Sequence, residues 1–137
     1  MRGQMMGGVM MYKIIAVLLS VILLTGCAAP AKELSYRQIG MEEAVTMMEE
    51  ESGYIILDVR TPEEFEEKHI PGAVNVPNET ISTEDIPELP DKGQLIFVYC
   101  RSGNRSKKAS AKLADLGYTN IVEIGGINDW TGETVSE

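Results

Sequence analysis

Residues 95–116 place a short loop directly between an apolar run and a segment with helical spacing, and this unit restricts the fold more than any other part of the chain. The run 95–99 is apolar and ends at Cys100, while Ala109, Leu113 and Leu116 recur at helical intervals after the loop. In such a unit, the N–H groups of the loop and the positive end of the helix converge on the residue at the strand tip. Because that residue is a cysteine, the unit predicts a loop that favours a thiolate.

Short apolar runs and helical segments also alternate along the rest of the chain. We expect strands at 34–39, 54–57, 73–76, 95–99 and 121–124. We expect four helices: one at 41–51, a short one that begins at 62, one that follows the loop after Cys100 and ends at 116, and a short one after 125. Thr61, Pro62 and Glu64 have the arrangement of a capped helix start, and a turn of helix is expected at 81–86. This alternation favours an α/β fold with a mainly parallel sheet covered by helices on both faces.

The N-terminus has the layout of an export signal. Arg2 and Lys13 are the only charged residues before residue 32, and they precede the apolar run 14–24. This run is shorter than the roughly 20 residues that a bilayer span needs, so it is typical of a secretory signal. Residues 24–27 resemble the lipobox of bacterial lipoproteins, which implies that the signal is removed and that Cys27 becomes lipidated. A plain signal anchor with an incidental cysteine is the alternative.

This layout predicts a domain organisation and a location. We expect a lipoprotein signal peptide at 1–26, a lipid-anchored tether at 27–33, a single folded domain at 34–132 and a C-terminal tail at 133–137. The protein would then be exported and attached to a bacterial membrane through its lipid, facing the extracytoplasmic side. Met10 and Met11 are alternative starts.

The charge of the chain excludes one class of partner and singles out one segment. The formal net charge is −9 for the whole chain and becomes −11 once the two cations of residues 1–26 are removed, so a nucleic-acid partner is not expected. Five of the ten remaining cations lie within residues 101–112. We interpret Arg101 and Arg105, in the loop itself, as part of an anion site, whereas the lysines that follow are typical of a solvated helix face.

The two cysteines have separate roles in this interpretation. A lipid on Cys27 leaves Cys100 without a disulfide partner, and an exported protein with one free thiol has either a buried spare cysteine or a working one. A polar, glycine-containing turn is a poor setting for a core cysteine. Nearby cations and a helix N-terminus can lower a thiol pKa from about 8.5 to roughly 3.5–7.5, so we predict that Cys100 is reactive.

Four segments, in the same order along the chain, resemble the signature blocks of single-domain rhodaneses. They are residues 58–65, 69–77, 100–106 and 125–130. The resemblance covers nearly all of the expected domain, 34–132. It implies a rhodanese-like α/β fold with a five-stranded, mainly parallel sheet, and sulfurtransferase chemistry at Cys100.

The resemblance also implies a mechanism and a set of site residues. Cys100 would attack thiosulfate or a persulfide donor, hold the transferred sulfur as a persulfide, and pass it to a thiol or to cyanide. The loop around it consists of Arg101, Ser102, Gly103, Asn104, Arg105 and Ser106. Asp58 and Arg60 are expected to form a supporting ion pair, and no metal or organic cofactor is required. His69 is expected to build a turn rather than to act as a base.

Three alternatives stay open at this point. Cysteine phosphatases have five residues between the cysteine and the arginine, whereas Cys100 and Arg105 are separated by four, which suits a sulfur atom better than a phosphate. A non-catalytic binding module is disfavoured by the presence of Cys100. A persulfide carrier that serves a partner protein fits the sequence as well as an enzyme does.

Overall fold

The computed structural model describes Gly26 and residues 35–137. All of the predicted tether, including Cys27, and all of the predicted signal peptide except Gly26 lie outside the described residues. Among the residues that are described, none of the helices has the length and apolarity needed to cross a membrane.

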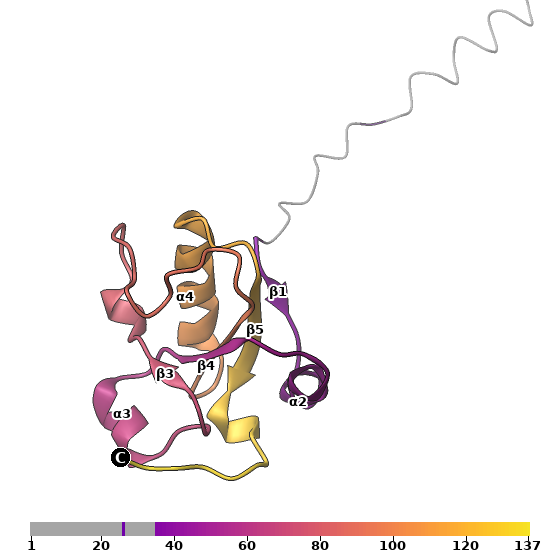
Figure 1. Ribbon diagram of the computed structural model, residues 1–137, viewed down its shortest axis with the longest axis vertical. Helices are drawn as coiled ribbons and strands as arrows, with labels where there is room; N and C mark the ends of the chain where they lie inside the picture. The colour runs from indigo at the N-terminus through magenta and orange to yellow at the C-terminus, as the bar shows by residue number, and fades with distance from the viewer. Residues whose placement is uncertain (1–25, 27–34) are drawn as a thin grey trace, which may run out of the picture. The chain divides into compact units, whose positions relative to one another are not determined.

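A parallel sheet forms the centre of the domain (Figure 1). Its strands are β1 (Arg37–Gln38), β2 (Ile55–Asp58), β3 (Val74–Asn75), β4 (Ile96–Cys100) and β5 (Ile121–Gly126). They lie in the order β1-β5-β4-β2-β3, and every neighbouring pair is parallel. The five-stranded parallel sheet that the sequence predicts is confirmed. Parallel strands in this order bring the carboxyl ends of β2, β3, β4 and β5 to one edge, where functional loops of such folds gather.

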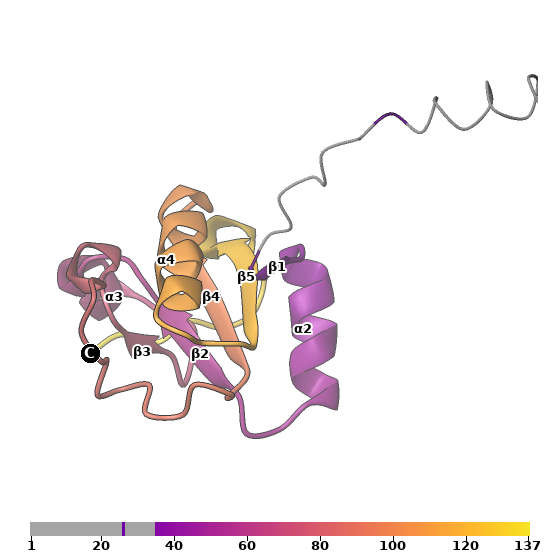
Figure 2. The ribbon, with the colours of Figure 1, turned by 90° about the horizontal axis from the view of Figure 1, so that it is seen from above.

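Helices cover both faces of the sheet (Figure 2). Helix α2 (Met41–Glu50) lies against one face, and α3 (Pro62–Glu67) and α4 (Asn104–Asp115) lie on the other side. Short 3₁₀ helices are found at η2 (Asn78–Thr80) and η3 (Ile127–Asp129). Helix α3 begins as predicted, with a capping box in which Thr61 and Glu64 bind each other's backbone N–H groups.

The helical turn predicted at 81–86 is wrong. The helical turn is η2, three residues earlier, and residues 81–86 are irregular. Ile81 and Ile86 are each buried, but they do not form one face of a helix. A residue that precedes a proline disfavours helical backbone angles. Pro87 therefore also prevents Ile86 from continuing a helix.

Alternate residues of β4 pack in two hydrophobic clusters, one on each face of the sheet. Ile96, Val98 and Cys100 point toward α4, whose Ala109 and Leu113 pack in the same cluster. The intervening residues of the strand pack on the opposite side, in a cluster that also contains Met41 and Ala44 of α2. The strand is buried along its whole length, so its last residue, Cys100, is held in a fixed direction by packing on both sides.

Residues 133–137, expected as a tail, make backbone contacts with the end of α3. The N–H of His69 donates to the carbonyl of Val135 at 2.8 Å, and the N–H of Val135 donates back at 3.0 Å. The N–H of Glu137 donates to the carbonyl of Glu66 at 3.2 Å. The end of the chain therefore closes over the segment that follows α3.

Candidate active site

The loop after β4 wraps its backbone around the sulfur of Cys100. Only residues 101–103 separate the end of β4 from the first residue of α4. Gly103 has a φ of 108°, a left-handed conformation that side chains other than glycine rarely adopt. This turn directs the N–H of Gly103 at the sulfur of Cys100, with a distance of 3.0 Å. The strand–loop–helix unit expected from the sequence is therefore present, with the thiol at its centre.

The loop lowers the pKa of the Cys100 thiol. Burial raises this pKa, but hydrogen bonds from the side chain of Ser106 and from the backbone N–H groups of Ser106, Gly103 and Ser102 outweigh the effect of burial. The direction agrees with the expectation from the sequence. The N–H groups of the loop contribute as expected, and the hydroxyl of Ser106 contributes a larger effect that the sequence did not indicate.

Arg105 is tied to α3 by a two-pronged ion pair. Its guanidinium lies 2.6 and 2.9 Å from the two carboxylate oxygens of Glu64. The hydrogen bond from Arg105 lowers the pKa of Glu64 to about 2, against a smaller opposing effect of burial. The sequence analysis assigned Glu64 to the capping box alone and missed this second role. Arg105 therefore anchors the loop to α3, while Arg101 is exposed on the loop.

A second carboxylate, Glu123, lies on the other side of the loop and was also missed. It is 3% exposed on β5, and its Oε1 atom is 2.6 Å from the hydroxyl oxygen of Ser106. The same Oε1 accepts the N–H of Gly125 at 2.8 Å. A signal was present in the sequence, because Glu123 is the only charged residue in the apolar run 121–124.

Asp58 and Arg60 form a buried ion pair at the end of β2. Arg60 Nη2 lies 2.7 Å from Asp58 Oδ2 and also donates to the carbonyl of Lys68. The hydroxyl of Tyr99 donates to the same Asp58 oxygen at 2.7 Å and accepts the N–H of Ile70 at 3.1 Å. The ion pair expected from the sequence is present. The hydrogen bond to Asp58 joins the pair to Tyr99, the residue immediately before Cys100.

The segment 125–130 contributes a close backbone contact with the loop. A side chain at Gly126 would collide with the carbonyl of Arg101 and with the N–H of Ser102. The N–H of Asn128 donates to the same Arg101 carbonyl at 3.2 Å. Only a residue without a side chain allows β5 to approach the loop this closely.

The remaining predicted residues have exposed side chains or structural roles. Ser102 and Asn104 are exposed on the loop. His69 is buried, with its Nδ1 at 2.8 Å from the carbonyl of Phe65 and its ring stacked on the ring of the same residue. Within residues 35–137, no group of three or more His, Cys, Asp or Glu side chains could hold a metal ion.

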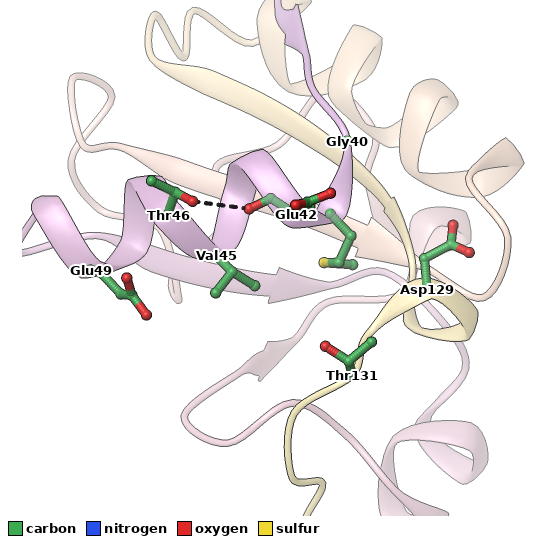
Figure 3. A pocket seen from close by; sticks show the side chains of 8 residues that line it. Gly40, Glu42, Val45, Thr46, Glu49, Asp129 and Thr131 are labelled. Carbon is green, nitrogen blue, oxygen red and sulfur yellow. Dashed lines mark hydrogen bonds between the residues drawn. The ribbon is translucent and has the colours of Figure 1, made fainter.

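A separate pocket of about 600 Å³ lies between α2 and the segment after η3 (Figure 3). Its lining is partly acidic, with Glu42 and Glu49 from α2 and Asp129 from η3. None of the residues that the sequence analysis assigned to the site lines this pocket. The sulfur of Cys100 instead lies against the N–H of Gly103 and the hydroxyl of Ser106.

Comparison with known proteins places these features in one family. The model of the rhodanese-like domain matches residues 41–133. The thiosulfate sulfurtransferase PspE of Escherichia coli is 36% identical over 73 residues, which cover 53% of this chain and 70% of that protein. The adenylyltransferase and sulfurtransferase UBA4 of Meyerozyma guilliermondii is 40% identical over 90 residues, which are 60% of this chain and only about a fifth (21%) of that protein.

Among solved structures, the chain is similar to a rhodanese with anions from Escherichia coli. The two are 32% identical with a TM-score of 0.56, and the match covers 61% of this chain and 99% of that one.

Proposed function

The chain belongs to the family of rhodanese-like domains and is a sulfurtransferase, and we propose that it carries sulfane sulfur as a persulfide on Cys100. One observation carries the proposal. The thiol at the end of β4 is buried and faces converging donors, and these donors lower its pKa although burial raises it. A thiolate stabilised in this way is the form that attacks sulfur.

The first half-reaction loads the enzyme. The thiolate of Cys100 attacks the outer sulfur of thiosulfate, so that a bond forms between the two sulfur atoms. The S–S bond of thiosulfate breaks, and sulfite leaves with its electron pair. The terminal sulfur of the new persulfide carries a negative charge, and the N–H groups of the loop are preorganised donors for it. We propose that Arg101, the exposed loop arginine, attracts the anionic donor.

The second half-reaction unloads the enzyme. A thiolate or cyanide attacks the terminal sulfur and forms a bond to it, while the S–S bond of the persulfide breaks and its electrons return to Cys100 as the thiolate. No net oxidation occurs, and each half-reaction displaces one thiophilic group by another. A persulfide donor in place of thiosulfate would follow the same steps, which is how a carrier that serves a partner protein would work.

The loop supports sulfur transfer better than phosphate hydrolysis. Four residues separate Cys100 from Arg105, and Arg105 is paired with Glu64 at 2.6 Å rather than directed into a cradle for phosphate. The function can be tested by measuring thiocyanate formation from thiosulfate and cyanide beside hydrolysis of an aryl phosphate. We expect the first activity only. We also expect one residue inserted between Gly103 and Asn104 to weaken it. Phosphatase activity in the unaltered protein, with no thiocyanate formed, would overturn the assignment.

We also propose that the protein is exported and held at a bacterial membrane by a lipid on Cys27. The support is the apolar run 14–24 followed by the lipobox-like residues 24–27. In a bacterial host, Cys27→Ala should either stay uncleaved or leave the membrane fraction. A variant of mature size that still partitions into detergent would contradict the lipid anchor.

A further inference from the structure

The hydroxyl of Ser106 lies among more acceptors than it can serve. Its oxygen is 2.6 Å from Oε1 of Glu123, 2.9 Å from the carbonyl of Gly103, 3.3 Å from the carbonyl of Gly125 and 3.4 Å from the sulfur of Cys100. A serine hydroxyl has one proton to donate and two lone pairs that accept. The hydroxyl therefore stabilises a thiolate only when its single proton points at the sulfur.

Glu123 is the strongest competitor for this proton. Hydrogen bonds from a hydroxyl to an ionised carboxylate are typically about 2.5–2.7 Å long and are stronger than those to a neutral acceptor. The distance from Ser106 to Glu123 lies in that range, and the distance from Ser106 to Cys100 is 3.4 Å. None of the ion pairs within residues 35–137 includes Glu123, and the residue is 3% exposed.

We propose that Glu123 is a positioning residue that acts through the Ser106 proton and thereby sets whether Cys100 holds or releases its own proton. The inference rests on the proposed role of Cys100 as the nucleophile. It connects a carboxylate on β5 with the nucleophile at the end of β4 through a hydroxyl on α4.

The two charge states of Glu123 give two complete hydrogen-bond chains. When Glu123 is ionised, Ser106 donates to it and accepts the S–H of Cys100, which favours the thiol. When Glu123 is protonated, it donates to the oxygen of Ser106, and the Ser106 proton is free to turn to the sulfur, which favours the thiolate. The two chains contain the same heavy atoms and the same number of protons, and they differ in whether one proton resides on Cys100 or on Glu123 and in the direction of the hydrogen bonds.

A charged group on α4 also acts on the sulfur. Arg105 of α4 interacts electrostatically with Cys100, and its charge is paired with Glu64 of α3. This pair is unchanged by substitution at Glu123, because none of its hydrogen bonds involves Glu123. A shift in Cys100 ionisation on changing Glu123 therefore reports on the path through Ser106 or on the charge of Glu123 itself.

The test uses Glu123→Gln, which is neutral, has nearly the same size and can donate an amide N–H to Ser106. The readout is the pH midpoint of Cys100 alkylation by iodoacetamide, which needs no sulfur donor and so can fail independently of the proposed function. We expect the midpoint to fall by about one pH unit. A midpoint that is unchanged or raised would overturn the proposal.

A second background separates the hydroxyl path from a simple charge effect. In Ser106→Ala, the path is absent, so Glu123→Gln should shift the midpoint by much less than it does in the unaltered protein. An equal shift in both backgrounds would overturn the role of Ser106. Ser110→Ala is the matched control, since Ser110 is buried on the same helix and its hydroxyl has no partner among the described residues; it should leave the midpoint in place.

If circular dichroism shows that Glu123→Gln does not fold, Glu123→Asp provides the same test. The shorter side chain keeps the charge but withdraws the carboxylate from Ser106, so the midpoint should again fall. A midpoint equal to that of the unaltered protein would overturn the proposal.

Discussion

Replacing Glu64 with glutamine removes the ion pair that ties α3 to the active-site loop. The capping box is kept, since a glutamine oxygen can still accept the N–H of Thr61. The pKa of Glu64 is lowered from an ordinary 4.5 to about 2. A pKa shift of this size corresponds to about 3.4 kcal/mol of folding stability for a group that is fully shielded from water. Both side chains of the pair are 27% exposed, so water screens them and we expect about 1–2 kcal/mol.

The dependence on pH follows from the direction of this shift. Because the folded pKa of Glu64 lies below the unfolded value, the contribution is complete above pH 4.5 and is lost as the pH falls toward about 2. At pH 3, about two fifths of it should remain. The loss of stability in Glu64→Gln should therefore be largest at neutral pH and should shrink by about three fifths by pH 3.

Urea unfolding of the protein at pH 7 and pH 3 measures this difference directly. Glu63→Gln is the matched control, because Glu63 is an exposed residue in the same first turn of α3. If both variants lose the same stability at pH 7, the ion pair contributes nothing beyond the charge of the helix start. A loss in Glu64→Gln that is equal at both pH values would also refute the reasoning.

Two further substitutions test other parts of the site. Gly126→Ala should strongly reduce thiocyanate formation, because the added methyl group displaces the loop backbone. Gly40→Ala is the control and should retain the activity, because Gly40 has open space around it. Equal activities of the two variants would contradict the close contact. His69→Ala should leave the alkylation midpoint of Cys100 within about 0.3 pH units while lowering the urea midpoint, since His69 packs on Phe65; a large shift in the alkylation midpoint would instead point to a role in the chemistry.

The sequence predicted the parts of this protein that depend on local patterns. Apolar runs of four or five residues fixed the positions of β2 and β4 to within one residue, because strands buried on both faces leave little room for polar residues. The capped start of α3 followed from Thr61, Pro62 and Glu64 in the same way. The cysteine at the tip of β4 followed from the loop between a strand and a helix.

The parts that the sequence did not predict depend on contacts between distant segments. Glu64 and Arg105 are 41 positions apart, and Ser106 and Glu123 are 17 apart. No local pattern indicates which carboxylate meets which loop residue, since this depends on the strand order that brings α3 and β5 to the two sides of the loop. The same holds for the part of Ser106 in lowering the Cys100 pKa, since only the folded loop determines where its hydroxyl lies.

A persulfide on Cys100 is detected most directly by the mass of the intact protein after incubation with thiosulfate and removal of excess reagent. We expect a gain of one sulfur atom, located on the peptide that contains Cys100, which disappears on adding cyanide as thiocyanate forms. Cys100→Ser should gain nothing and should form no thiocyanate. Sulfur transfer that survives in Cys100→Ser, or turnover with no persulfide on the Cys100 peptide, would contradict the central claim.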